Sequence, residues 1–263
     1  MAARRLQHGG RIDRDTPLRF TWDGGAMSGY QGDTLASALL ANNERVVGRS
    51  FKYHRPRGVT SAGVEESGAL VTVGSGARRD PNVRATGQEL YEGLVASGQN
   101  AWPSVRFDVG GLNNLLSRFF VAGFYYKTFM GMPPFEWGRG TGWWMWYEKL
   151  IRRAAGMGSV SRLPDPDRYE HAHDYCDVLV VGSGPAGLAA ALTAAEAGLD
   201  VVLAEQDSEA GGSMLADADD SERVAQLEAV RGAGVRIRTR TTVFGLYDHC
   251  VAGLFERVTD HLA

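Results

Sequence analysis

The residues best suited to bind a ligand lie between positions 182 and 212. One stretch matches the pattern G-x-G-x-x-G, and it consists of Gly182, Ser183, Gly184, Pro185, Ala186 and Gly187. In this pattern the first glycine permits a tight turn, the second lets the backbone approach a pyrophosphate, and the third lets helix and strand pack closely. A helix that begins at such a loop presents free amides and a positive dipole end to phosphates. The pattern therefore predicts a dinucleotide site.

An acidic residue follows at the spacing that this chemistry requires. Glu205 lies about 20 residues beyond the glycines, at the end of the next predicted strand. A carboxylate there accepts hydrogen bonds from ribose and repels a 2′-phosphate, which disfavours NADP. We predict NAD as the ligand, with FAD as the alternative because its ADP half uses the same pattern. Gln206, Gly211 and Gly212 complete the predicted cofactor-binding set, although the glycine pair equally suits an ordinary flexible loop.

Residues for covalent or metal catalysis are not apparent. Ser183 lies in Gly-Ser-Gly-Pro rather than in the G-x-S-x-G turn of serine hydrolases. Cys176 and Cys250 are too isolated for a C-x-x-C metal site or a disulfide framework, and we expect Cys176 to be a buried small hydrophobe. We predict no catalytic residue and no metal ligand in this chain.

The elements around the glycine pattern are those of a βαβ unit. Residues 177–181 form an apolar run typical of a strand buried on both faces of a parallel sheet. An Ala-rich helix over 188–197 and a strand over 200–204 follow. A helix over 221–231 and strand character over 235–247, interrupted by Gly245, come next. Residues 175–263 are thus predicted as the first part of an incomplete α/β Rossmann-type domain.

A different pattern occupies the N-terminal part of the chain. Alternation at Leu18, Phe20 and Trp22 predicts a half-buried strand, and a second strand is expected over 27–30. Asp33 is a suitable N-cap for a helix over 34–41. Further strand candidates are 46–47 and 69–73. We predict a flexible arm over 1–16 and an α+β domain over 17–108.

Residues 109–174 are predicted as an aromatic-rich helical connector. Helices are expected over 112–128 and 144–155, and a polar linker over 162–173 marks a domain boundary. The aromatic belt from Phe119 to Trp146 suits either a subunit interface or packing within the chain, and we slightly favour the latter.

Composition limits the partners of the chain. Lys and Arg total 28 against 31 Asp and Glu, which gives a net charge of -3 and no electrostatic case for nucleic acid. No apolar run reaches the roughly 20 residues that cross a bilayer. We expect no membrane association, no secretory signal, and a reducing, cytoplasmic location.

Several longer motifs carry a resemblance to a known family. They are Gly32-Asp33-Thr34-Leu35-Ala36-Ser37-Ala38-Leu39-Leu40-Ala41-Asn42, Arg49-Ser50-Phe51-Lys52-Tyr53-His54-Arg55-Pro56-Arg57-Gly58, Gly123-Phe124-Tyr125-Tyr126-Lys127-Thr128-Phe129-Met130 and the glycine pattern at Gly182. Nearly the whole chain resembles the N-terminal part of the alpha subunits of heterotetrameric sarcosine oxidases and related amine and opine oxidases.

The resemblance implies a ferredoxin-like β-grasp fold for residues 17–108. Relatives with an iron–sulfur cluster carry their cysteines in the loop after the helix. Residues 50–63 here contain no Cys, and a [2Fe–2S] cluster needs about four thiolates. We therefore expect a cluster-free domain, as in sarcosine oxidase.

The resemblance also implies a function for the complex. Its alpha subunit binds NAD, its beta subunit holds FAD, covalent FMN lies near the alpha–beta interface, and gamma and delta subunits complete it. The reaction would be oxidative demethylation of sarcosine to glycine, with formation of hydrogen peroxide and, from tetrahydrofolate, methylenetetrahydrofolate. Family alpha subunits are several-fold longer and end in a folate-binding domain. We therefore expect this chain to be either a fragment or a truncated gene product, one that binds NAD and is inactive alone.

Two other function classes are compatible with the sequence. One is a non-catalytic assembly module that docks a flavin-bearing partner, and the weaker one is a ferredoxin-like electron carrier. The basic run Arg49, Lys52, His54, Arg55 and Arg57 suits contact with an anionic cofactor or a partner subunit, or equally a solvated loop. We expect His54 to be structural rather than catalytic.

Overall fold

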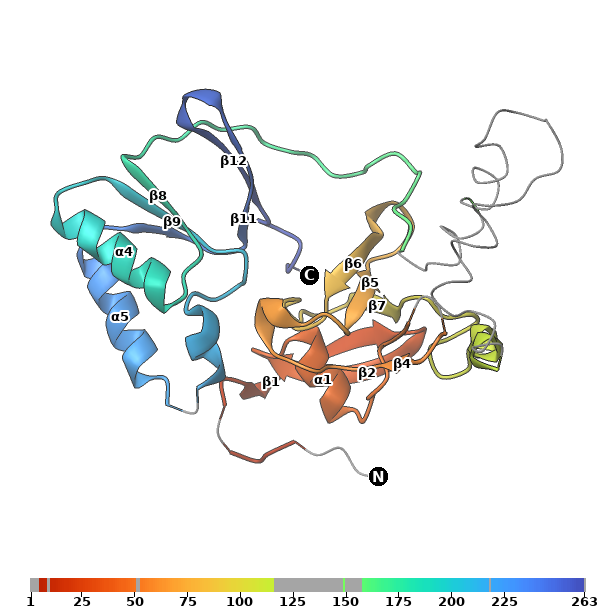
Figure 1. Cartoon of the computed structure of the whole chain (residues 1–263). Helices are drawn as coiled ribbons and strands as arrows, with labels where there is room; N and C mark the ends of the chain where they lie inside the picture. The colour runs from red at the N-terminus through yellow and green to blue at the C-terminus, as the bar shows by residue number, and fades with distance from the viewer. Residues whose placement is uncertain are drawn as a thin grey trace, which may run out of the picture.

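In the described part of the chain, the two larger sheets lie in separate lobes (Figure 1), and two further sheets have two strands each. The computed structural model describes residues 5–8, 10–50, 53–115, 149, 158–217 and 219–262. The N-terminal lobe holds a five-stranded sheet in the order β2-β1-β7-β5-β6. Its elements are β1 (Asp13–Trp22), β2 (Gly25–Gln31), α1 (Leu35–Ala41), β5 (Leu70–Val73), β6 (Asp80–Arg84) and β7 (Leu94–Gly98). We call this lobe the N-terminal domain.

The N-terminal sheet is mixed, because β1 pairs antiparallel with β2 and parallel with β7. Helix α1 packs against it through Leu35, Ala38 and Leu39, whose side chains are buried in the core. The predicted α+β fold is confirmed in this respect. Strand β1 begins at Asp13, inside the segment predicted as a flexible arm, so residues 13–16 belong to the sheet.

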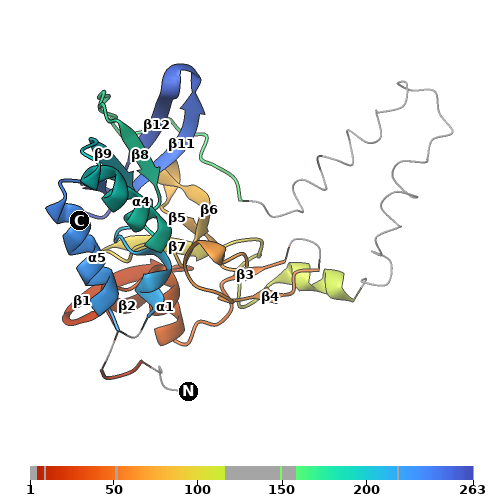
Figure 2. The same cartoon turned by 60° about the vertical axis from the view of Figure 1, so that its left-hand side comes forward.

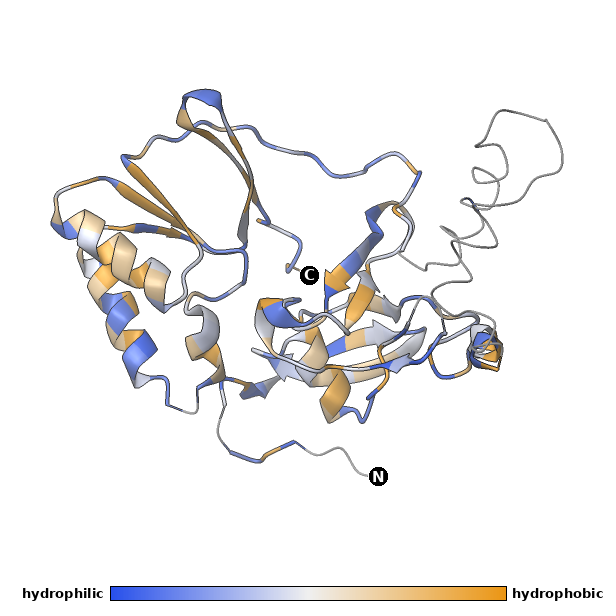
Figure 3. Ribbon diagram, in the orientation of Figure 1, coloured by the Kyte–Doolittle hydropathy of each residue, from blue (hydrophilic) through white to orange (hydrophobic). Residues whose placement is uncertain are grey.

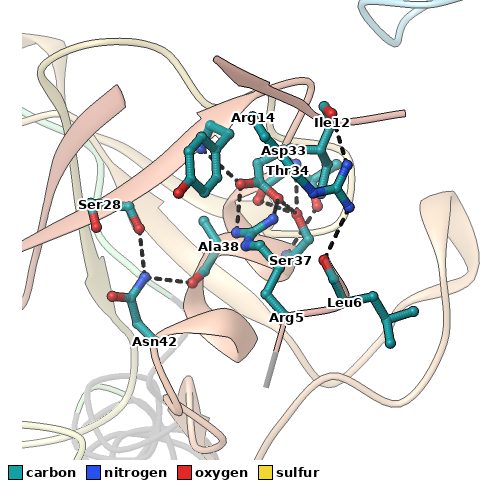
Figure 4. Close-up of polar contacts among 11 residues, drawn as sticks. Arg5, Leu6, Ile12, Arg14, Ser28, Asp33, Thr34, Ser37, Ala38 and Asn42 are labelled. Atoms are coloured by element: carbon teal, nitrogen blue, oxygen red, sulfur yellow. Dashed lines mark hydrogen bonds and ion pairs between the residues drawn. The ribbon is translucent and has the colours of Figure 1, made fainter. Parts of the chain in front are cut away.

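The N-cap of α1 corrects a prediction. Thr34, not Asp33, caps the helix: its hydroxyl accepts from the Ser37 amide, and the Ser37 hydroxyl accepts from the Thr34 amide. The Asp33 side chain is instead fully buried and accepts from Tyr30 N, Ser37 Oγ and the Arg5 guanidinium (Figure 4). Asp33 thereby ties the segment before β1 to the start of α1.

Shorter elements link the larger ones in this lobe. Strands β3 (Gly48–Arg49) and β4 (Pro56–Arg57) form a two-stranded antiparallel sheet. Strand β3 begins one residue after the strand predicted at 46–47. Strand β5 confirms the prediction at 69–73, whereas β6 and β7 were not predicted. The remaining short helices are η1 (Gly63–Glu65), η2 (Gly76–Arg78) and η3 (Val109–Asn114).

The second lobe is a βαβαβ arrangement. It consists of β8 (Val178–Val181), α4 (Pro185–Glu196), β9 (Val201–Ala204), α5 (Ser221–Gly232) and β10 (Arg236–Arg238). The three strands are parallel, in the order β10-β9-β8. Both helices cover one face of the sheet (Figures 1 and 2) and pack through Leu188, Ala191, Leu227 and Val230. Figure 3 shows β8 and β9 as hydrophobic, whereas β10 has the sequence Arg-Ile-Arg, and α5 carries both hydrophilic and hydrophobic residues along its length.

Burial within this sheet differs from the prediction. The strand over 177–181 was expected to be buried on both faces, but in the described structure β8 has a neighbour only on the β9 side and Val181 is 63% exposed. The fully buried strand is β9, which lies between the other two. Cys176 is exposed rather than buried, because it precedes this edge strand.

The span 235–247, predicted to have strand character interrupted at Gly245, is divided at residues 239–240 instead, and Gly245 lies within a strand. Arg240 has a φ of 53°, which ends β10 and turns the chain into β11 (Thr241–Tyr247). Strand β11 pairs with β12 (Val251–Glu256) through the turn η5 (Asp248–Cys250).

The segment between the two lobes, residues 158–176, contains no helix or strand, and it includes the linker predicted at 162–173. Most of the predicted helices over 112–128 and 144–155, and the aromatic belt, fall outside the described residues. Of the described positions, residues 112–114 belong to η3, Leu115 follows it as its C-cap, and Lys149 is helical.

Candidate nucleotide-binding site

The glycine loop, residues 182–187, connects β8 to α4. Gly182 has a φ of +92°, a conformation that favours glycine, and its amide donates to Ala204 O at 2.8 Å. At Gly187 a Cβ would overlap the carbonyl oxygen of Gly182. The loop therefore closes tightly on itself, and these two glycines are required by its backbone.

The N-terminus of α4 is open to a ligand. Gly184 is the N-cap, Pro185 follows at the first helical position, and Leu188 is the first amide to donate to Gly184 O, at 2.9 Å. The amides of Ala186 and Gly187 therefore have no acceptor within the helix. A Cβ on Gly184 would meet nothing within 4 Å, so its backbone is accessible. Open backbone beside free amides is the arrangement that accepts a pyrophosphate.

Glu205 lies directly beneath this loop. Its Oε2 accepts from the amide of Ser183 at 2.8 Å and from the hydroxyl of Ser183 at 2.6 Å, while Oε1 accepts from the Asp207 amide at 3.0 Å. The side chains of Glu205 and Ser183 are both buried. The structure thus brings Glu205 to the predicted site, where it stabilises the glycine loop through Ser183.

The glycine pair closes over the same loop. The Gly211 amide donates to Ser183 Oγ at 3.0 Å, and a Cβ on Gly212, whose φ is +55°, would lie 2.7 Å from Gly184 Cα. Residues 205–212, here called the acid–glycine loop, therefore contact the glycine loop at both ends. Gln206 is the exception among the predicted residues: it is exposed, and its carbonyl accepts from Arg257 at 2.7 Å.

Two residues in and beside the acid–glycine loop were missed from the sequence. Burial and, to a lesser extent, the neighbouring Glu205 charge raise the pKa of Asp207 to about 6, and the charge of Arg257 opposes this shift. Arg223, from α5, donates to Ala210 O at 2.9 Å and pairs with Asp220. Asp207 could have been found from the sequence, because a second acid stands two positions after Glu205. No local sequence feature indicated a role for Arg223.

The basic run lies in the N-terminal domain and forms a polar network. His54 Nδ1 lies 2.7 Å from Asp108 Oδ2, and Arg49 donates to Val105 O at 2.6 and 3.0 Å. Arg55 stacks on the ring of Tyr53 at 4.9 Å. These contacts fit the structural role expected for His54. Lys52 falls outside the described residues.

Neither a metal centre nor a membrane span is evident in the described residues. No three His, Cys, Asp or Glu side chains in that part of the chain are grouped as metal ligands would be. No helix there has the length and apolar character needed to cross a bilayer.

Family comparisons divide the chain as its two lobes do. Residues 15–101 match a 2Fe-2S iron-sulfur cluster binding domain, and residues 177–252 match a FAD dependent oxidoreductase family. The chain thus combines a ferredoxin-type domain with a flavoprotein-type oxidoreductase region. The cysteines present do not fit a cluster, because residues 15–101 contain none and the two in the chain lie at positions 176 and 250.

Curated relatives confirm the resemblance drawn from the motifs. The chain is 53% identical over its full length to sarcosine oxidase subunit alpha of Rhizobium meliloti, and it covers 27% of that protein. It is 35% identical over 97% of its length to sarcosine oxidase subunit alpha of a Corynebacterium species, covering 22% of it. The chain therefore resembles sarcosine oxidase alpha subunits throughout and spans about a quarter of the length of these relatives.

A solved structure, L-proline dehydrogenase from P. horikoshii, aligns with 95% of this chain and 38% of its own at 18% identity and a TM-score of 0.49. That likeness is too weak to bear on the fold.

Proposed function

We propose that this chain binds NAD at the glycine loop as part of a sarcosine oxidase alpha subunit. The observation that carries the proposal is the convergence of Gly184, Glu205 and Gly212 at the N-terminus of α4. The amides of Ala186 and Gly187 would bind the pyrophosphate, which is the chemistry that a helix N-terminus supplies. FAD is the alternative occupant, and the match of residues 177–252 to a FAD dependent oxidoreductase family supports it.

Glu205 would contact the ribose from its position beneath the loop. An ionised carboxylate offers about four acceptor positions, and three are taken by the amide and hydroxyl of Ser183 and by the Asp207 amide. One position is left for a ribose hydroxyl. The negative charge at this position disfavours a 2′-phosphate, so NAD should bind more tightly than NADP.

The wider activity is proposed from the relatives. A complex with beta, gamma and delta subunits, with FAD and FMN on or near the beta subunit, would oxidise sarcosine to glycine. Hydrogen peroxide and methylenetetrahydrofolate would be the other products. In that complex this chain would bind the nucleotide and hold its domains in place, and it would not catalyse the reaction alone. The absence of Cys from residues 15–101 supports a cluster-free N-terminal domain.

The second candidate is a non-catalytic assembly module. It is favoured by large apolar side chains that are exposed to solvent within residues 102–115: Trp102 is 71% exposed, Phe107 69% and Leu112 61%. Exposed apolar groups gathered in this way are typical of protein–protein contact sites. Co-purification of the chain with a flavin-bearing subunit, and its loss in Trp102→Ser, would support this candidate.

Calorimetric titration of the folded chain tests the proposed function. NAD, NADP, FAD and ADP are titrated in turn against the unaltered chain, Glu205→Gln and Glu196→Gln. Glu205→Gln keeps the shape of the side chain but removes its charge, and Glu196 is an exposed acid at the end of α4. We expect saturable NAD binding, about ten-fold weaker NADP binding, and a smaller NAD/NADP difference in Glu205→Gln only. A folded chain that binds none of the four ligands would contradict the proposal.

A further inference from the structure

The N-terminal domain reaches the acid–glycine loop at its glycine end. Arg11, which precedes β1, donates from Nη1 to Asp220 Oδ1 at 2.7 Å and forms an ion pair with Glu209. Its side chain is only 25% exposed. Glu209 and Asp220 lie on either side of Gly211 and Gly212 in the sequence. Arg11 therefore links the two flanks of the glycine pair.

A second arginine makes these flanks a single unit. Arg223 binds Asp220 through Nε and Nη2, each at 2.5 Å, and donates from Nη1 to Ala210 O at 2.9 Å. Asp220 therefore accepts from Arg223 and from Arg11 together. The hydrogen bonds from Arg223, with a smaller contribution from Arg11, lower the pKa of Asp220 to about 2. Asp220 stays ionised at neutral pH and connects the acid–glycine loop to Arg11.

The other end of the acid–glycine loop is reached from the same domain. Glu89 accepts a two-pronged contact from Arg240, at 2.7 and 2.8 Å. The Arg240 amide donates to Asp207 O at 2.8 Å, and the next amide, that of Thr241, donates to Glu205 O at 2.7 Å. The side chain of Glu89 thus fixes the backbone on which Glu205 and Asp207 are held.

The segment that carries Arg11 is itself fixed to the N-terminal domain. Arg5 makes a two-pronged contact with Asp33 at 2.7 and 3.0 Å, and Arg14 donates to Leu6 O and Ile12 O (Figure 4). The carbonyl of Arg11 lies against Gly32, where a Cβ would overlap it. Because its backbone is held in this way, Arg11 can transmit the position of the N-terminal domain to the acid–glycine loop.

We propose that the N-terminal domain positions the nucleotide-binding loop, with Arg11 and Glu89 as its positioning residues. This inference rests on the proposed function and assigns a role to a ferredoxin-type domain that has no cysteine for a cluster. Neither residue touches the glycine loop. Each acts through the acid–glycine loop, which contacts Gly184 and Ser183. Loosening either link should leave the fold intact, raise the mobility of the loop and weaken nucleotide binding.

The test uses the full chain and four variants. Arg11→Ala and Glu89→Gln each break one link, and Arg11→Lys keeps the charge. Arg78→Ala is the matched control, because Arg78 also forms an ion pair over a long sequence distance, with Asp167, but far from the acid–glycine loop in the sequence. The dissociation constant for NAD is measured by calorimetry. Hydrogen exchange of the Gly211 amide, which donates to Ser183 Oγ, reports on the loop without any nucleotide.

We expect about five-fold weaker NAD binding in Arg11→Ala and in Glu89→Gln, with faster exchange at Gly211 and an unchanged thermal midpoint. Arg11→Lys should bind within about two-fold of the unaltered chain, as should Arg78→Ala. If NAD binds equally well to all variants and exchange at Gly211 is unchanged, the positioning role is wrong while the proposed function stands. If the unaltered chain binds no nucleotide, the proposed function fails, and exchange at Gly211 alone decides whether Arg11 and Glu89 hold the loop.

Discussion

The Glu205 carboxylate and the Ser183 hydroxyl are joined at 2.6 Å, and this hydroxyl is also the acceptor for the Gly211 amide at 3.0 Å. One small side chain therefore connects the end of β9 to the glycine loop and to the glycine pair. Because Ser183 is fully buried, water cannot replace these bonds. The arrangement of Glu205, the glycine loop and Gly211 therefore depends on the Ser183 hydroxyl, which is not one of the glycines of the pattern.

Removing the hydroxyl should therefore loosen the site. In Ser183→Ala the Gly211 amide loses its acceptor and Glu205 loses one donor, which should lower the free energy of unfolding by about 1–3 kcal/mol. Urea unfolding measures this change. Ser161→Ala is the control, since the Ser161 hydroxyl also accepts from a main-chain amide, that of Leu163, but in an exposed segment. Equal effects of the two substitutions would contradict the role given to Ser183.

The two glycines at the start of α4 should respond differently to a methyl group. At Gly187 a Cβ would overlap Gly182 O, so Gly187→Ala should cost about 3 kcal/mol of stability. Gly184 has a φ of -65° and open space around it, so Gly184→Ala should change stability by less than about 1 kcal/mol. The new methyl group would nevertheless occupy the approach to the pyrophosphate, and NAD affinity should fall about ten-fold or more.

A third glycine supplies the control for this pair. Gly232 ends α5, away from the glycine loop in the sequence, and a methyl group added to its Cα would meet nothing within 4 Å. Gly232→Ala should leave NAD affinity unchanged. Calorimetry for affinity and urea unfolding for stability separate the outcomes. If Gly184→Ala binds NAD as tightly as Gly232→Ala, the pyrophosphate does not approach at Gly184.

The cap of α1 gives a prediction independent of any ligand. The Thr34 hydroxyl accepts from the Ser37 amide at 3.2 Å, and Ser37 Oγ accepts from the Thr34 amide at 3.0 Å. Thr34→Ala removes the hydrogen bond from the Ser37 amide to the Thr34 hydroxyl and should lower the free energy of unfolding by about 1 kcal/mol. Thr16→Ala is the comparison, because the Thr16 hydroxyl on β1 donates to Asp13 in a solvent-exposed bond. A thermal midpoint equally lowered in both variants would argue against the cap.

The βαβ unit could be predicted because its pattern is local. The apolar strand, the glycines and the Ala-rich helix follow one another in the sequence, and each of these residue types favours the local structure that it forms here. The cap of α1 was predicted one residue too early because Asp and Thr are both good N-caps. Sequence alone could not show that the Asp33 carboxylate instead accepts hydrogen bonds from Arg5, because the two residues are 28 positions apart.

Features fixed by long-range pairing were missed. Strand β6 contains Pro81 and Asn82, and Asn82 has a φ of 64°, so local propensity argues against a strand that exists because it pairs with β5. The contact of Arg11 with Asp220 spans 209 residues and has no sequence pattern. For the same reason, Glu205 could be placed at the end of a strand, but its bonds to Ser183 depend on the pairing of β8 with β9.

The stability of the chain should depend on pH through Asp207. Burial beside Glu205 raises the pKa of Asp207 from 3.8 to about 6, so the folded state binds more protons than the unfolded state between these values. The free energy of unfolding contributed by this group therefore falls as pH rises through that window and stays low above it. Asp207→Asn should gain about 1–2 kcal/mol over the unaltered chain at pH 7.5, after allowance for the partial exposure of the carboxyl, and almost nothing near pH 4. Urea unfolding at both pH values measures this, with Asp248→Asn in the exposed turn η5 as the control. A gain of the same size at both pH values would show that the Asp207 charge is not the cause.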